Sequence, residues 1–204
     1  KGVTMHPSEQ FRLERQTRLE SYASDGAFQT LSRDWLQASM QRKYVYNFDW
    51  MGRPIIQYPQ DMVAMQELVW RVRPDLIIET GIAHGGSLVL SASLLALLDM
   101  SDAIEADTTL NPRTSRRKVL GVDIDIRAHN RAAIESHPMA SRIAMIQGSA
   151  IAPEVVQQAA QAIAPPDVAS AVRGAALSSI PGESDVSRPA FEISIVLGSP
   201  MRRP

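Results

Sequence analysis

The chain of 204 residues contains no cysteine, which excludes disulfides, thiolate metal sites and a cysteine nucleophile. It also lacks an apolar stretch of the length expected for a transmembrane helix, and it lacks a signal peptide, so we expect a cytoplasmic protein. Neither sign of charge dominates, because the formal net charge at pH 7 is -1. We therefore expect no surface that binds nucleic acid or an anionic membrane.

Length and composition fit one globular domain. The chain has 45% hydrophobic and 21% charged residues, an ordinary balance for a packed core. Its 204 residues are enough to bury that core in a single α/β domain. The first residue is Lys1 rather than methionine, which is compatible with a start inside a longer reading frame.

The most informative stretch is a short apolar run that ends in Glu79 and continues into a glycine-rich turn. The run is β-branched and predicts a buried parallel strand, while residues 87–98 predict a helix. Gly81, Gly85 and Gly86 allow the backbone to approach a ligand closely. The free N–H groups at the helix start suit carboxylate, phosphate or hydroxyl groups.

The glycine spacing is G-x-x-x-G-G, which differs from the G-x-G-x-x-G of dinucleotide sites. An acid two residues before the first glycine favours a cationic amine, as in S-adenosylmethionine (SAM) sites, because a carboxylate would repel pyrophosphate. A tight turn without any ligand is the alternative. His84, inside the turn, is a candidate base or substrate contact, and an ordinary backbone hydrogen bond is its alternative role.

A second acid follows a second predicted strand at 118–125. In a doubly wound sheet, a carboxylate at this strand end faces the ribose hydroxyls of a nucleoside, and we assign that role to Asp123. Capping of the next helix is the alternative task, and Asp125 fits it better. A third strand at 142–147 leads into a turn with Ser149, which would lie beside the adenine.

Four sequence blocks in order, at 50–62, 73–87, 121–125 and 147–149, resemble the cephalosporin hydroxylase and rhamnosyl O-methyltransferase family. The resemblance implies an α/β fold with the Rossmann-like, doubly wound parallel sheet of class I methyltransferases. It implies a divalent metal, usually magnesium, and O-methylation of a sugar, lipid-linked glycan or secondary metabolite. It also implies a SAM site, for which the candidate residues are Glu79, Gly81, Gly85, Ser87, Asp123 and Ser149.

The chain divides into three predicted segments: an N-terminal helical segment at 1–43, a SAM-binding domain at 44–163, and a tail rich in Pro, Ala and Ser at 164–204. Helices are expected at 8–22 and 31–42, as a cover over the sheet edge, a lid or a contact in a homo-oligomer. A third helix is expected to be capped by Asp61 and closed by Pro74. The polar residues 100–117 predict a solvated loop.

The tail departs from the family pattern, so we expect an incomplete C-terminal half. A fourth strand is predicted at 191–197, with Gly198 where the family carries an aspartate. In that register a metal ligand is missing, and no metal ligand is assigned. In the alternative, the tail is unrelated sequence from a frameshift or a truncated gene, and the fourth strand is absent.

Two hypotheses about function follow. The first is a SAM-dependent O-methyltransferase that acts on a small-molecule or glycolipid acceptor and works mainly by proximity. The second is a non-catalytic cofactor-binding remnant or partner subunit. An oxidising activity on a β-lactam is a third, suggested only by the family name, and the chain offers no cysteine and no histidine pair for a redox centre. No catalytic residue is assigned.

Overall fold

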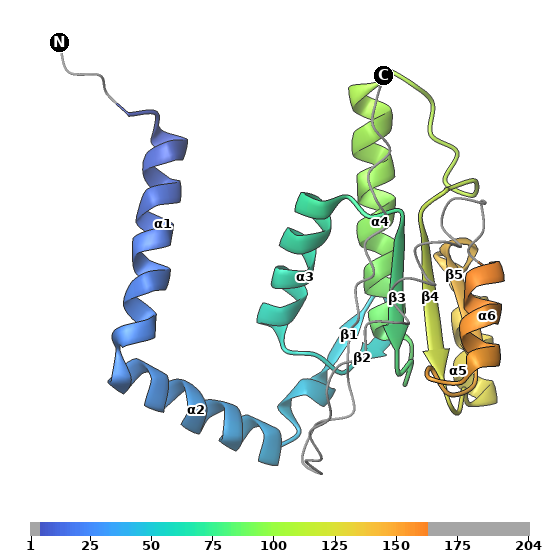
Figure 1. Ribbon diagram of the computed structural model, residues 1–204, viewed down its shortest axis with the longest axis horizontal. Coiled ribbons are helices and arrows are strands. Elements are labelled where there is room, and N and C mark those ends of the chain that lie inside the picture. The colour runs from blue at the N-terminus through green and yellow to red at the C-terminus, as the bar shows by residue number, and fades with distance from the viewer. Residues whose placement is uncertain (1–4, 163–204) are drawn as a thin grey trace. The chain divides into compact units, whose positions relative to one another are not determined.

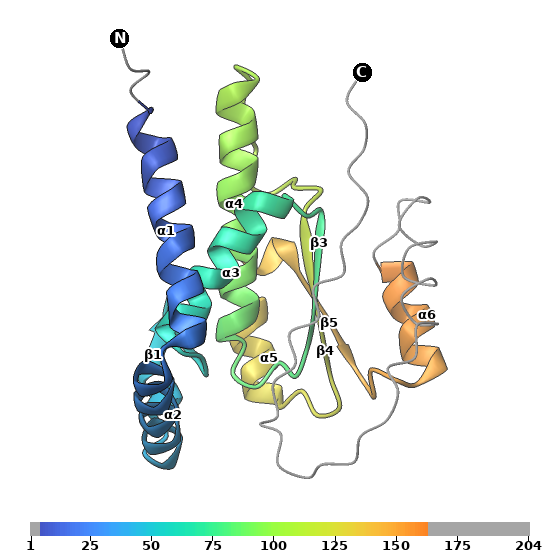
Figure 2. The same ribbon diagram turned by 60° about the vertical axis from the view of Figure 1, so that its left-hand side comes forward.

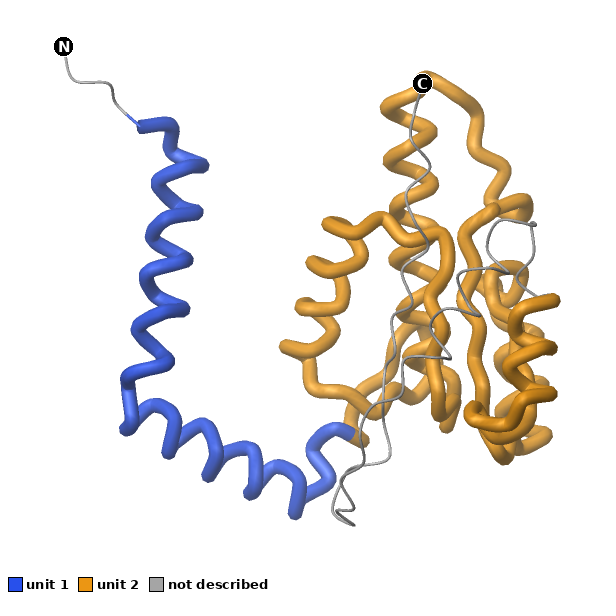
Figure 3. Tube along the Cα trace, viewed as in Figure 1, with its two compact units in different colours: residues 1–45 blue, residues 46–204 orange. Residues whose placement is uncertain are grey.

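The computed structural model describes residues 5–162 and divides the chain into two compact units, residues 1–45 and 46–204 (Figures 1 and 3). The predicted tail at 164–204, with the strand at 191–197 and Gly198, lies outside the described residues. The elements, in chain order, are α1 Pro7–Ser24, α2 Gly26–Gln41, η1 Tyr44–Asn47, β1 Phe48–Trp50, β2 Arg53–Ile55, α3 Pro59–Val72, β3 Leu76–Thr80, α4 Gly86–Glu105, β4 Lys118–Asp123, α5 Ala128–Glu135, η2 Ala140–Arg142, β5 Ile143–Gln147 and α6 Pro153–Ala162.

The first unit consists of α1 and α2, which meet at Asp25. The Asp25 side chain caps α2 by accepting a hydrogen bond of 2.9 Å from the Phe28 N–H. The ring of Phe28 lies 5.0 Å from that of Tyr22, across the bend between the helices. The second helix begins at Gly26 rather than at 31, since this cap starts it earlier than the apolar spacing predicts. The roles predicted for these helices stay predictions.

The second unit is built on a parallel sheet with the strand order β3-β4-β5. Each strand pairs with the next in sequence, and Glu79 lies opposite Gly121, which in turn lies opposite Met145. Two helices, α4 and α5, connect these strands, as parallel pairing requires. The three predicted strands are thus confirmed, within two residues of their expected ends.

Apolar side chains cover both faces of the sheet, so the sheet is doubly wound. On one face, Ile77 and Val119 are fully buried against α3, α4 and α5. On the other face, Leu120 and Val122 pack with Val155 of α6. Figure 2 shows α4 and α6 on opposite sides of the strands. Together with the parallel order, this confirms the Rossmann-like α/β class expected from the sequence.

Helix α4 is longer than the predicted 87–98, because it runs to Glu105. By length and composition it is the one helix among the described residues that could cross a membrane, which corrects the expectation that no stretch is long enough. Half of its most apolar 18-residue stretch is buried, and Leu88, Leu95 and Leu98 are fully enclosed in the core. Its apolar composition is therefore accounted for by packing on the sheet.

The expected solvated loop at 100–117 is wrong at both ends, because two of its residues belong to a partly buried ion-pair network. Arg117 lies 2.6 Å from Asp99 and 2.8 Å from Asp102, which also pairs with Arg73. Arg142 lies 2.5 Å from Asp99, and its side chain is only 3% exposed. Burial alone would raise the pKa of Asp102, but hydrogen bonds from Arg117 and Arg73 hold that pKa below its usual value.

Two predicted helix caps are also wrong. Helix α3 begins at Pro59 after Tyr58, with no side-chain cap, so Asp61 lies inside its first turn. Proline is favoured at this position because its missing N–H would have no partner there. Helix α5 begins after Arg127, again with no side-chain cap, so Asp125 does not cap it. The predicted end before Pro74 is confirmed, since Arg73 closes α3 in a left-handed conformation with φ of 52°.

Candidate functional site

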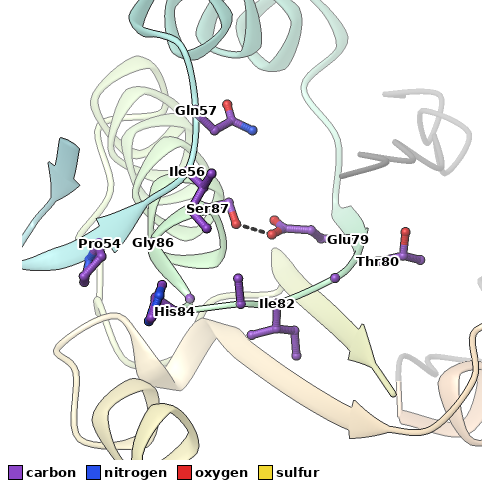
Figure 4. A pocket seen from close by; sticks show the side chains of 12 residues that line it. Pro54, Ile56, Gln57, Glu79, Thr80, Ile82, His84, Gly86 and Ser87 are labelled. Carbon is purple, nitrogen blue, oxygen red and sulfur yellow. Dashed lines mark hydrogen bonds between the residues drawn. The ribbon is translucent and has the colours of Figure 1, made fainter. Parts of the chain in front are cut away.

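The predicted ligand-binding corner forms a pocket at the carboxyl end of β3. Its walls are the end of β3, the glycine-rich turn, the first residues of α4 and the segment after β2 (Figure 4). Four of the six predicted site residues line it, namely Glu79, Gly81, Gly85 and Ser87. The cavity is about 10 Å³, which is space for about one water molecule, so a larger ligand would extend outward from it.

Among the described residues that line this pocket, Glu79 is the one carboxylate, and it is almost fully enclosed, with 2% of its surface exposed. One oxygen, Oε1, accepts a hydrogen bond from the Ser87 hydroxyl, which faces it across the pocket (Figure 4). The other oxygen, Oε2, is buried and has no hydrogen-bond partner among the described residues. Burial raises the pKa of Glu79 to about 7, and the hydrogen bond from Ser87 partly opposes this rise.

The glycines at the start of α4 allow a close approach of three segments. A Cβ on Gly86 would lie 2.3 Å from the Pro54 carbonyl oxygen, and one on Gly85 would lie 2.4 Å from the Ile134 side chain. Gly85 also has a φ of 83°, in the left-handed region that favours glycine. Only glycine therefore fits at either position, and the hairpin β1–β2 can pack directly on the first turn of α4.

Asp123 lies at the end of β4, beside the turn rather than in the pocket. Its Oδ2 accepts hydrogen bonds of 2.6 Å from the Ile82 N–H and 3.4 Å from the Ala83 N–H. Its Oδ1 accepts one of 3.0 Å from the Asp125 N–H. The carboxylate thus holds the glycine-rich turn in place. A carboxylate offers about four acceptor sites, so these bonds do not exclude a further one from a ribose hydroxyl. That predicted contact stays a prediction.

Ser149 lies in the loop between β5 and α6, outside the lining of this pocket. The loop is tied to β4 because the Gly148 N–H donates to the Asp123 carbonyl oxygen at 2.8 Å. Gly148 has a φ of 155°, and a Cβ there would lie 2.5 Å from Val155. The predicted residues therefore share the carboxyl edge of the sheet, but in two places: four in the pocket, and Asp123 and Ser149 beside it.

Two residues that support the turn were missed in the sequence. Arg53, from β2, donates to the His84 carbonyl oxygen through Nε at 3.0 Å and through Nη2 at 2.5 Å. Asn130, from α5, donates to the Ala83 carbonyl oxygen at 2.9 Å, and its own oxygen accepts from Arg53 Nη2 at 3.2 Å. Arg53 lies within the block 50–62 that carries the resemblance, but no local pattern marks Asn130.

Two of the four histidines, His84 and His137, lie near the turn and the hairpin. His84 lines the pocket, and its carbonyl oxygen is the acceptor for Arg53. His137 Nε2 lies 3.0 Å from the Met51 carbonyl oxygen, and its Nδ1 accepts from the Met139 N–H at 3.1 Å. Within residues 5–162, no group of three or more His, Cys, Asp or Glu side chains is arranged to hold a metal ion. The described residues therefore offer no preformed cluster of three such ligands for a magnesium ion.

Comparison with known protein families gives a match that covers more than half of the chain. The family model described as rhamnosyl O-methyltransferase/CmcI matches residues 42–172. The chain belongs to this family. The resemblance expected from the four sequence blocks is thereby confirmed, and the matched residues include the hairpin, the glycine-rich turn and the strand ends that build the pocket.

Two solved structures of CmcI are similar to this member of the rhamnosyl O-methyltransferase/CmcI family. One, titled with SAH, is 22% identical, with a TM-score of 0.33, over 52% of this chain and 45% of that chain. The other, titled with Mg-SAM, is 20% identical, with a TM-score of 0.37, over 55% of this chain and 40% of that chain. The chain thus spans less than half the length of these solved relatives. No curated protein matches it.

Proposed function

We propose that this chain is a SAM-dependent O-methyltransferase whose cofactor binds at the β3–α4 corner. Its membership of the rhamnosyl O-methyltransferase/CmcI family supports the reaction class. The parallel sheet, with a glycine-rich turn at the carboxyl end of its first strand, supports the place of binding. A cytoplasmic location is part of the proposal.

The observation that carries the proposal is the unpartnered Oε2 of Glu79. A buried carboxylate oxygen without a partner loses the hydrogen bonds it would make to water, so this one is expected to have a partner in the working protein. An ammonium group supplies both an opposite charge and a donor. The amino group of SAM has this chemistry, and the pocket offers Glu79 as its only carboxylate.

The residues of the corner would act by binding and orienting the cofactor. Glu79 would hold the ammonium group, with Ser87 fixing the carboxylate through its hydroxyl. The N–H groups of the first turn of α4 have no acceptors inside the helix and suit the carboxylate end of the same ligand. Bound SAM supplies an activated methyl group, and its fixed position beside an acceptor hydroxyl would provide the proximity on which such transfers depend.

The acceptor belongs to the proposal only as a class: a hydroxyl of a sugar, a glycolipid or a secondary metabolite. The family description, which names a rhamnosyl O-methyltransferase, supports this class. We derive no step through magnesium, because the described residues offer no preformed cluster of metal ligands. We assign no base for the acceptor hydroxyl.

The test is calorimetric titration of the full chain with S-adenosylhomocysteine (SAH), which carries the same amino acid group as SAM. The Glu79→Gln variant removes the negative charge but keeps the shape, and we expect it to bind SAH at least about tenfold more weakly, the loss typical of a charge-assisted hydrogen bond. Glu105→Gln, an exposed change at the far end of α4, is the matched control.

Four outcomes are informative. Binding that is weakened in E79Q and retained in E105Q supports the assignment. Equal affinity in all three proteins contradicts the role of Glu79, and no binding to the parent contradicts the proposed cofactor. Binding of SAH by the parent without methyl transfer to any hydroxyl acceptor would favour the non-catalytic alternative.

A further inference from the structure

The glycine-rich turn has an unusual backbone conformation. Gly81, Ala83 and Gly85 all have positive φ values, of 84°, 48° and 83°. Two are glycines, for which this costs little, but Ala83 is not. A residue held in such a conformation persists only when its surroundings specify it. The turn must therefore be fixed by contacts outside itself.

Polar groups from three elements provide those contacts. Asp123, on β4, binds the N–H groups of Ile82 and Ala83. On the carbonyl side, Asn130 of α5 binds the oxygen of Ala83, and Arg53 of β2 binds the oxygen of His84. Neither Asn130 nor Arg53 lines the pocket, so both carbonyl oxygens are bonded to groups outside it.

Arg53 and Asn130 also fix each other. Arg53 Nη2 donates to the Asn130 oxygen, which leaves the Asn130 amide nitrogen to donate to Ala83. Asn130 is 4% exposed, so an amide in the opposite orientation would place two donors against each other without water to separate them. The pair spans 77 residues of sequence and joins the hairpin, the turn and α5.

We propose that Arg53 and Asn130 are positioning residues for the cofactor, a role that rests on the proposed function. They keep the carbonyl oxygens of Ala83 and His84 bonded outside the pocket, so that Glu79 and the N–H groups at the start of α4 are the polar groups presented to the ligand. Without the pair, the turn gains access to conformations in which a carbonyl oxygen faces the ligand's carboxylate. Cofactor affinity then falls although the fold persists.

The experiment uses two variants of the full chain, Asn130→Asp and Arg53→Lys, with SAH as the probe. Asn130→Asp is almost isosteric and keeps the contact with Arg53, but it replaces the donor to Ala83 by an acceptor. Arg53→Lys keeps the charge and removes the two-pronged contact with His84. We expect a loss of SAH affinity of about tenfold or more for N130D, with a smaller loss for R53K. R53K also serves as the test if N130D does not fold.

The matched control is Trp50→Phe. Trp50 anchors the same hairpin by donating from Nε1 to Ser93 Oγ at 3.0 Å, and neither residue lines the pocket. We expect W50F to lower the melting temperature but to keep the SAH affinity within about twofold of the parent. Hydrogen exchange measured by mass spectrometry should become faster at residues 82–86 in N130D and R53K, and stay unchanged there in W50F.

The two readouts separate this proposal from the proposed function. SAH affinity unchanged in N130D and R53K, or reduced as much in W50F, would overturn the positioning role. Should the parent itself not bind SAH, the proposed function fails. Faster hydrogen exchange confined to 82–86 in N130D and R53K would then still support the view that Arg53 and Asn130 stabilise the turn. Unchanged exchange in both variants would overturn it.

Discussion

The raised pKa of Glu79 predicts that the ligand-free protein loses stability as the pH rises. The folded carboxyl has a pKa of about 7, against a usual value of 4.5 in the unfolded chain. Below pH 4.5 it is protonated in both states, so its contribution to stability is fully present. That contribution is lost as the pH rises through 7, because the folded state then holds a buried charge that the unfolded state exposes to water.

The size of the effect follows from these two values. Their difference of about 2.5 corresponds to a total on the order of 3 kcal/mol at about 1.4 kcal/mol for each pH unit. Over the practical range from pH 5.5 to 8, the expected loss is about 2 kcal/mol, since part of the change occurs below that range. This is a sizeable share of the 5–15 kcal/mol typical of a folded domain.

The measurement is urea unfolding followed by circular dichroism at several pH values, for the parent and for Glu79→Gln. The amide does not titrate, so the parent's stability relative to the variant should fall by about 2 kcal/mol between pH 5.5 and 8. Taking this difference cancels the titration of the four histidines, which both proteins share. Glu105→Gln should show the same pH dependence as the parent. Parallel curves for the parent and E79Q would refute the reasoning.

Three further predictions concern the turn and the core. Gly86→Val should destabilise the protein by more than about 2 kcal/mol in urea unfolding, since its Cβ would lie 2.3 Å from the Pro54 carbonyl oxygen, and a normal unfolding curve would contradict this. Asp123→Ala should weaken SAH binding about tenfold in calorimetry, because it frees the N–H groups of the turn and removes the predicted ribose contact, whereas equal affinity would exclude both roles. Arg142→Met should lower the free energy of unfolding by about 3 kcal/mol because it leaves Asp99 short of a buried partner, and Asp99→Asn in the same chain should recover part of that loss.

The strands and the glycine-rich turn could be predicted because their signals are local. A β-branched run such as 76–79 has few alternatives to a buried strand, and glycine at 81 and 85 marks left-handed backbone within a few residues. The burial of Glu79 follows from its place one residue before the end of such a strand. Four of the candidate residues therefore lie in one pocket, as a single local corner of the sequence suggests, and their role in ligand binding stays a prediction.

The remaining contacts depend on pairs that are far apart in the sequence. Arg142 meets Asp99 across 43 positions, and Arg53 meets Asn130 across 77. Nothing near Asp102 or Arg117 distinguishes an ion pair from a solvated loop, which is why the prediction for 100–117 is wrong at its two ends. The prediction of Asp61 as a helix cap is wrong for a different reason. A carboxylate in the first turn of a helix is favourable even when it is not the cap, so the local sequence does not distinguish these two positions.

The burial of Glu79 and the support of the turn bear on what this site binds. Burial of the charged Glu79 costs stability unless a cation is bound beside it. The turn is supported by Asp123 on one side and by Arg53 and Asn130 on the other, three side chains on three different elements. A neutral residue at 79 would relieve that cost, whereas the positive φ of Ala83 would still require the support. A buried carboxylate beside a turn held in this way is therefore better explained by the binding of a cationic group than by folding stability alone.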